Sequence, residues 1–177
     1  MTSARVAAAV HRLHAVLERK PASGRHDDAP AHVRWQGETR VVARHANGTE
    51  VVTDMPEELG GSGDRVTPGW LFRAGLASCT ATTIAITAAA RGIALDALEV
   101  EARSRSDTRG LLGMTDATGR AVPAGPGDVE LHVRVAAAGT PAERLRALVE
   151  DSCRCAPVSN AVEQATPFAL RIDVREG

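Results

Sequence analysis

The longest run of apolar and small residues in the chain lies between positions 67 and 92, TPGWLFRAGLASCTATTIAITAAARG. Thr67-Pro68 is typical of a helix start, because the amide that proline lacks would be unpaired in the first turn. Arg91-Gly92 supplies a cation and a glycine, which are typical of a helix end. No charged residue stands between Arg73 and Arg91. The pattern therefore predicts one long, buried core helix, too rich in Thr, Ala and Gly for a typical membrane span.

Alternating patterns elsewhere predict β-strands. The segments HVRWQG, TRVVARH and TEVVTD, between residues 32 and 54, read as three short strands, with Asn47-Gly48 as a strong hairpin signal. Two further strands are expected within residues 94–107 and 128–137, and a last one within 169–176. The glycine-rich residues 55–66 and the turn-rich residues 107–127 are predicted to be loops.

Two shorter helices complete the pattern. Residues 3–19 form an amphipathic repeat that ends before a broken, polar linker at 21–30. A later helix has Thr140 as its expected N-cap, Pro141 in its first turn and Glu143 at the capping-box position, and Pro157 breaks or restarts it. The order of helix, three strands, long helix, two strands, helix and strand indicates an α+β fold. We expect residues 1–31 to be an N-terminal helix and linker, and residues 32–177 to be the main domain.

Composition narrows the class of protein. The chain has 177 residues and a net charge of −1, which favours one domain and gives no reason to expect a nucleic acid or a membrane surface as a partner. Residues 1–20 carry Arg and His throughout, so no secretory signal is expected. Three cysteines, an odd number, favour a reducing cytoplasm over a disulfide-bonded secreted protein.

The residues alone leave the chemistry open. Cys79 lies in the middle of the stripe of larger side chains on the long helix, where a cysteine is most often only a small buried hydrophobe. Cys153 and Cys155 have a metal-ligand spacing, but no neighbouring His or Cys completes a tetrahedral site, so we expect no metal. The glycines at 60, 61 and 63 lack the ending of a phosphate loop. No cofactor is therefore expected.

Two segments carry a resemblance to a known family. PEELGG at 56–61 followed by TPGWLFRAGLASC at 67–79 resembles the osmotically induced protein and organic hydroperoxide resistance superfamily, in which an ELGG loop leads into an NPE-x-LF-x-AG-x-x-x-C helix. CAPVSNAV at 155–162 is similar to the second signature of that family, Cys-Pro-x-Ser-x-Ala. The similarity covers roughly residues 32–175 and leaves the N-terminal helix as an addition.

The resemblance implies an OsmC-like fold, with antiparallel sheets packed on the long helix, and an intertwined homodimer whose two chains close two identical sites. It also implies reduction of organic hydroperoxides by a peroxidatic thiol, here Cys79. The resulting sulfenic acid condenses with a second thiol, and a small or protein dithiol reduces the disulfide. In the family an arginine of the first hairpin stabilises the thiolate, and a glutamate just after the proline of the long helix holds that arginine.

This chain departs from the family at two positions. The arginine falls on Arg40, with Arg44 and Arg34 as alternatives, but the glutamate position is Gly69, which cannot orient a guanidinium. The resolving cysteine would stand directly before Pro157, where this chain has Ala156. The nearest thiol, Cys155, is one residue earlier, which on a helix is a rotation of about 100°. Cys153 is a poorer substitute, because it lies farther from the proline.

Two hypotheses follow from these residues. The first is a peroxidase with Cys79 as the peroxidatic thiol, Arg40 as its activator and Cys155 as a possible resolving thiol; without Cys155, an external thiol would resolve Cys79. The second is a non-catalytic dimer of the same fold that binds a small hydrophobic molecule, which the loss of the glutamate and of the second cysteine favours. A redox sensor for a partner has no support beyond the thiols.

Overall fold

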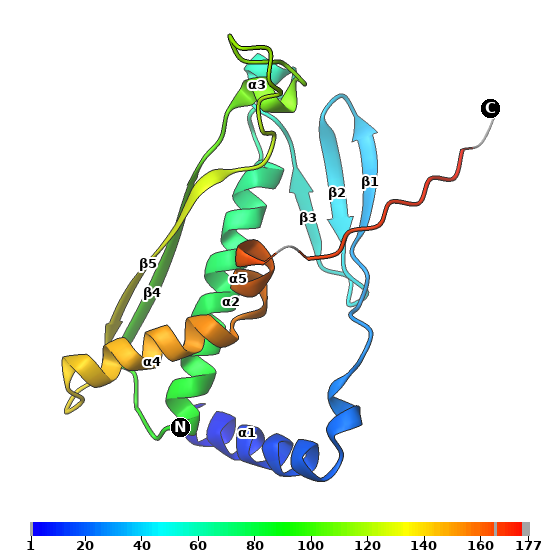
Figure 1. Ribbon diagram of the computed structural model, residues 1–177. Coiled ribbons are helices and arrows are strands. Elements are labelled where there is room, and N and C mark those ends of the chain that lie inside the picture. Colours follow the sequence, from blue (N-terminus) through cyan, green and yellow to red (C-terminus); the bar gives the residue numbers. More distant parts are fainter. Residues whose placement is uncertain (1, 165, 175–177) are drawn as a thin grey trace.

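The computed structural model describes residues 2–164 and 166–174, and the long helix α2 (Pro68–Ala90) lies at its centre. The Thr67 hydroxyl accepts a hydrogen bond from the Trp70 amide and caps the helix, and Gly92 adopts a positive φ of 68° just beyond its end. Both helix limits predicted from the sequence are therefore confirmed. Figure 1 shows α2 as the green axis between two sheets that lie on opposite sides of it.

The two sheets are both antiparallel. The first has the order β1-β2-β3 and the second pairs β4 with β5. Their bounds are β1 His32–Gly37, β2 Arg40–Arg44, β3 Glu50–Thr53, β4 Ala97–Arg105 and β5 Gly127–Ala136. The turn at Asn47-Gly48 joins β2 to β3, as predicted, and its glycine has a φ of 90°. The architecture is thus α+β, as the element order indicated.

The hydrophobic core lies between α2, the β4–β5 pair and α4 (Ala142–Cys155). Ile84 and Leu148 are wholly buried at its centre, and alternate residues of β4 and β5 pack around them. Helix α5 (Pro157–Glu163) follows α4 after a break at Pro157 and packs on the middle of α2. Helix α1 (Thr2–Arg19) packs against the C-terminal end of α2 (Figure 1).

The prediction that α2 is a buried helix is only half right for a single chain. Four of the buried residues follow a spacing of four, Leu76, Thr80, Ile84 and Ala88, and Ala89 is buried beside the last of them. This side meets β4, α1, α4 and α5. Phe72 and Ile86, two of the larger apolar side chains of the helix, are 37% and 40% exposed. By length and composition alone α2 could cross a membrane. An apolar pattern on a helix indicates that a face is shielded from water, but it does not tell whether the same chain or another molecule shields it.

The structure differs from the predicted pattern at one helix limit and in one loop. Pro141 has φ −58° and ψ 145°, so it flanks α4 and the helix begins at Ala142. Thr140 therefore stands outside the expected N-cap position, and no side chain caps this helix. The predicted loop at 107–127 contains the short helix α3 (Thr108–Leu111), which Asp107 caps by accepting from the Arg109 amide.

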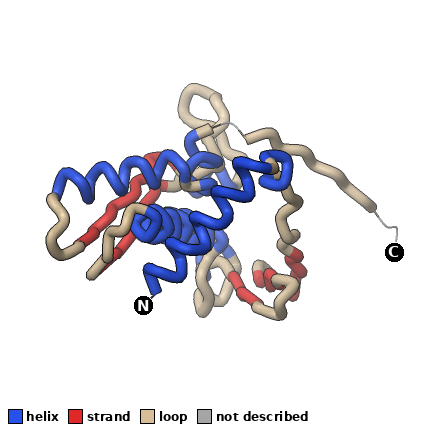
Figure 2. Tube along the Cα trace, turned by 90° about the horizontal axis from the view of Figure 1, so that it is seen from below, coloured by secondary structure: helices blue, strands red, loops and turns tan. Residues whose placement is uncertain are grey.

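The last predicted strand does not form within the chain. Residues 166–174 have no strand pairing and extend away from the body in both views (Figure 1 and Figure 2). Their alternate apolar side chains are between 72% and 87% exposed: Phe168, Leu170, Ile172 and Val174. The alternation that predicts a strand is therefore present, but no strand of the described residues pairs with it. Residues 175 and 176 of that prediction lie outside the described residues.

Candidate functional site

A buried carboxylate organises the glycine-rich loop that leads into α2. Asp54 directly follows β3 and is 3% exposed. It accepts hydrogen bonds from the Thr39 hydroxyl at 2.5 Å, the Ser62 hydroxyl at 2.7 Å and the Met55 amide at 2.8 Å. These hydrogen bonds hold the pKa of the Asp54 carboxyl well below its ordinary range. The bond from Thr39 has the largest effect, and the bond from Ser62 has the next largest. Asp54 therefore stays ionised and ties the β1–β2 hairpin to the loop.

Arg40 is held by this loop. Its Nε and Nη2 atoms lie 3.3 and 3.1 Å from Asp54 Oδ2, and Nη2 also donates to the Ser62 hydroxyl at 2.6 Å and to Asp64 Oδ1 at 2.5 Å. The Ser62 hydroxyl and Arg40 lower the pKa of Asp64. Among the described residues, Nη1 of Arg40 makes no hydrogen bond. The guanidinium is thus oriented by two aspartates, and its remaining edge is available to another group.

The carboxylates that hold Arg40 were not identified from the sequence. Gly69 has no side chain that could hold a guanidinium, and Asp54 and Asp64 bond to Arg40 instead. The position of Asp54 directly after a strand, and of Asp64 in a loop of glycines, was the only available signal. Nothing in the spacing indicated that both would converge on Arg40.

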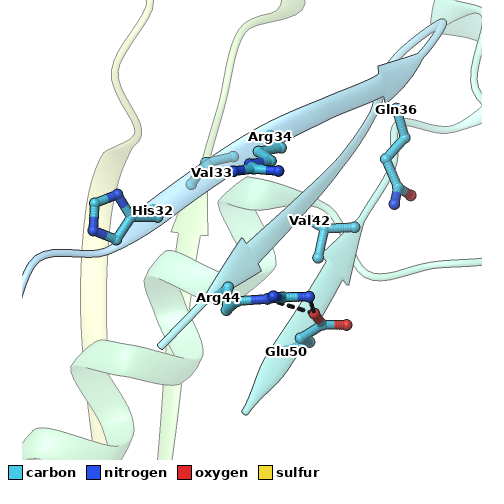
Figure 3. A pocket seen from close by; sticks show the side chains of 7 residues that line it. All are labelled: His32, Val33, Arg34, Gln36, Val42, Arg44 and Glu50. Carbon is cyan, nitrogen blue, oxygen red and sulfur yellow. Dashed lines mark hydrogen bonds and ion pairs between the residues drawn. The ribbon is translucent and has the colours of Figure 1, made fainter. Parts of the chain in front are cut away.

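The other two candidate arginines are placed elsewhere. A polar recess of about 590 Å³ lies on the three-stranded sheet, and Figure 3 shows its lining: His32, Val33, Arg34, Gln36, Val42, Arg44 and Glu50. Arg44 forms an ion pair with Glu50, with 2.7 Å between Nε and Oε1, and Arg34 lies on the same recess. Arg40 is therefore the candidate that reaches the glycine-rich loop.

The sulfur of Cys79 lies against the segment CAPVSNAV. Cys79 is half-buried in the middle of α2, and the Val158 amide of α5 lies 3.5 Å from its Sγ. One residue further along each segment, the Thr80 and Ser159 hydroxyls are buried and 3.2 Å apart. Because Thr80 donates to the Leu76 carbonyl, Ser159 is the donor between the two hydroxyls. The fold thus brings together two segments that are 79 residues apart in sequence.

The three cysteines have different surroundings, and all are free. Ala156, at the position directly before Pro157, is wholly buried, whereas Cys155 is exposed at the end of α4. Cys153 lines a groove between α4 and β5, and burial raises its pKa, with a smaller contribution from Glu163. A raised pKa leaves less of the reactive thiolate at neutral pH, so Cys153 is the less suitable second thiol.

Arg40 and Cys79 belong to different parts of the chain. Arg40 is bound to the loop that precedes α2, whereas Cys79 is 12 residues beyond Thr67, or about 18 Å along the helix axis. Within the described part of the chain, no hydrogen bond joins the two side chains. No three His, Cys, Asp or Glu side chains of the described residues come close enough to hold a metal ion. One chain therefore holds the parts of the expected site at separate places.

Residues 61–171 match a protein-family model described as OsmC-like protein. An OsmC-like protein from Mycoplasma pneumoniae has a similar structure, with a TM-score of 0.64 at 14% identity, over 80% of this chain and 91% of that one. An organic hydroperoxide resistance protein from Elizabethkingia anophelis gives 0.60 at 23%, over 80% and 91%. At these identities the likeness shows the fold. None of the curated proteins compared with the chain matches it.

The close contact at Gly61 generates a stability prediction. A Cβ at this position would lie 1.8 Å from the Met55 carbonyl oxygen and 2.9 Å from Asp54 Oδ1, so Gly61→Ala must displace the loop and is expected to cost about 3 kcal/mol or more. Gly125→Ala is the matched control, because its Cβ would meet nothing within 4 Å. Urea unfolding measures both. A loss of less than about 0.5 kcal/mol in Gly61→Ala would contradict this account.

The ionised Asp54 generates a pH prediction. Because its pKa is lower in the folded chain, its contribution to stability is present above the unfolded pKa of about 4 and is lost as the pH falls below that value. The stability advantage of the wild type over Asp54→Asn, measured by urea unfolding, should therefore be largest at neutral pH and shrink toward pH 3. An advantage that stays constant over this range would show that the charge of Asp54 is not what stabilises the loop.

Proposed function

Because the chain belongs to the OsmC-like protein family, we propose that it is a thiol-dependent peroxidase in which Cys79 reduces organic hydroperoxides. The observation that carries the proposal is the contact of the Cys79 sulfur with the Val158 amide. This contact joins the two sequence signatures at one thiol. The nucleophile in such chemistry is the sulfur itself, and the Val158 amide lies where it can donate a hydrogen bond to that sulfur. The names of several relatives of similar fold, as organic hydroperoxide resistance proteins, agree with this chemistry.

The reaction follows from the chemistry of the thiolate. The Cys79 thiolate attacks the terminal oxygen of the hydroperoxide, the O–O bond breaks, and the alkoxide leaves and takes a proton from the solvent to become the alcohol. Cys79 is then a sulfenic acid. A second thiol displaces water from it and forms a disulfide, which a dithiol reduces back to two thiols through a mixed disulfide. The chain needs no metal or organic cofactor for any of these steps.

A second copy of the chain supplies the missing part of the site. Arg40 lies near the start of α2 and Cys79 near its middle, so an antiparallel pair of α2 helices would bring the Arg40 of one chain toward the Cys79 of the other. The exposed Phe72 and Ile86 give α2 an apolar face for such a pair. We therefore place the reacting thiol and its activating guanidinium on different subunits of a homodimer. The free edge of Arg40, at Nη1, would face the sulfur.

The resolving thiol is Cys155 or an external thiol. Cys155 is exposed, which suits attack by a dithiol reductant, but a disulfide with Cys79 requires Cβ atoms roughly 3.5 to 4.5 Å apart. Residue 156, which faces the buried interior, is an alanine. The free thiols agree with a reducing cytoplasm as the place of action.

A second candidate function is the binding of a small hydrophobic molecule without catalysis. An apolar cavity of about 440 Å³ beside the start of α2 favours it. Ala156 also favours it, because this chain lacks a thiol at the buried resolving position. The two functions differ in whether the wild type consumes peroxide.

The first prediction from this proposal concerns turnover. With dithiothreitol as the reductant, the wild type should consume cumene hydroperoxide faster than hydrogen peroxide, and Cys79→Ser should fall to the background rate because it lacks the nucleophile. Cys153→Ser is the matched control and should keep the wild-type rate. Loss of turnover in Cys155→Ser would assign it the resolving role, and retained turnover would assign that role to the external thiol. No consumption by the wild type would favour the binding function instead.

The shared site predicts complementation between inactive variants. Cys79→Ser and Arg40→Gln dimers should each be slow alone. After unfolding, mixing and refolding, about a quarter of the wild-type rate should return, because half of the dimers are mixed and each mixed dimer has one intact site. If both residues acted within one chain, mixing would restore nothing. Full activity of Arg40→Gln would instead remove Arg40 from the mechanism.

A further inference from the structure

The charge of the chain is unevenly distributed. Residues 1–20 contain four basic residues, Arg5, Arg12, Arg19 and Lys20, and one acidic residue, Glu18, so their net charge is +3 with histidine neutral. Because the whole chain has a net charge of −1, the rest of it carries −4. The near-neutral total gave no reason to expect a membrane partner, but it conceals a basic segment that consists of α1 and the residue after it.

Three arginines form a line along α1. Arg5, Arg12 and Arg19 are spaced by seven residues, which is nearly two full turns of an α-helix, so the line is about 21 Å long. All three are exposed, and none forms an ion pair with a described residue. The carboxylate of Glu18 lies instead 3.4 Å from His14 Nδ1. The described part of the chain therefore does not neutralise the charge of this line.

The arginine line points away from α2. Val10 and Leu17 are half-buried on the side of α1 that packs on the end of α2. Arg12 and Arg19 stand two residues after them, a rotation of about 200° around the helix. Figure 1 shows α1 along the lower end of the molecule, across the end of α2. The exposed apolar face that we assign to the dimer lies on α2 itself, so the arginines are on a different surface.

Two apolar side chains stand beside these cations. Leu13 is 57% exposed and Val16 is 40% exposed. Val16 follows Arg12 by four residues and precedes Arg19 by three, so the three side chains are neighbours on the helix surface. Exposed apolar side chains flanked by arginines are typical of a helix that lies in the headgroup region of a membrane.

We propose that α1 docks the protein on a membrane surface that contains anionic lipids. In this arrangement Arg5, Arg12 and Arg19 bind lipid phosphates, and Leu13 and Val16 lie at the boundary with the acyl chains. Clusters of four or more basic residues on an amphipathic helix are typical of proteins that bind such lipids.

An acidic protein would offer the same charge, but the line has little to recognise one with. Ala8 and Ala15 follow the first two arginines by three residues and are exposed on the same line. Their side chains are too small to select a particular protein surface, whereas a lipid surface requires only charge and an apolar boundary. Helix α1 lies outside residues 61–171, which match the family model, and it contains no cysteine. The proposal therefore goes beyond the peroxidase function and does not depend on it.

The test is sedimentation of the wild-type protein with vesicles of phosphatidylcholine alone, and of phosphatidylcholine and phosphatidylserine in equal parts. The protein should bind only the anionic vesicles. Binding should weaken as the salt rises from about 0.1 M to about 1 M, because the screening length falls from about 10 Å to about 3 Å. The double variant Arg12→Gln/Arg19→Gln should bind about 25-fold more weakly, since each basic residue near such a surface contributes a factor of about five.

The matched control is Arg144→Gln/Arg146→Gln, which removes the same charge from α4. Both of these arginines are exposed, and neither forms an ion pair with a described residue. This variant should bind anionic vesicles like the wild type. Leu13→Ala should bind them several-fold more weakly, because less apolar area reaches the acyl boundary.

Three results would overturn the proposal. They are no binding of the wild type to anionic vesicles at the lower salt concentration, equal binding to the two kinds of vesicle, and equal losses in the two double variants. The first result would leave an acidic protein as the partner of α1. The third would show that binding follows total charge rather than the arginine line. Far-UV circular dichroism checks that each variant is folded. The assay contains no peroxide, so a failure of the peroxidase proposal does not affect it.

Discussion

The site region of this protein depends on one buried carboxylate. Asp54 receives hydrogen bonds from Thr39 and Arg40 of the β1–β2 hairpin and from Ser62 of the glycine-rich loop. Neither segment belongs to the core around Leu148. A buried charge is costly unless it is fully paired, and at Asp54 the pairing itself sets the shape of the loop. The same loop then delivers the chain to Thr67, and so the start of α2 is placed by electrostatics rather than by apolar packing.

Much of the fold was readable from local patterns. The limits of α2, the three strands of the first sheet and the break at Pro157 follow from chemistry within a few residues, and the structure has them where the sequence predicts them. The sequence did not predict which face of α2 is buried. Phe72 and Leu76 are equally apolar, and only the tertiary arrangement distinguishes them. The prediction of Thr140 as the N-cap was wrong for a local reason, because Pro141 has the extended conformation of a residue that flanks the helix.

Only those parts of the candidate site that a sequence motif marks could be predicted. Cys79 and the segment around Ser159 could be singled out by resemblance, and the fold does place them in contact. The groups that hold Arg40 could not be found this way, because Asp54 and Asp64 are brought to it by strand register and by turns at glycines such as Gly61.

The extended C-terminal segment has a consequence for how the protein is made. Its alternating apolar side chains, from Phe168 to Val174, are exposed, and no strand of the described residues pairs with them. Such a segment adds readily to any open sheet edge, including that of a foreign protein. Until a sheet edge pairs with this segment, the folded chain is open to aggregation, and the yield of protein should depend on chain concentration as well as on the stability of each chain.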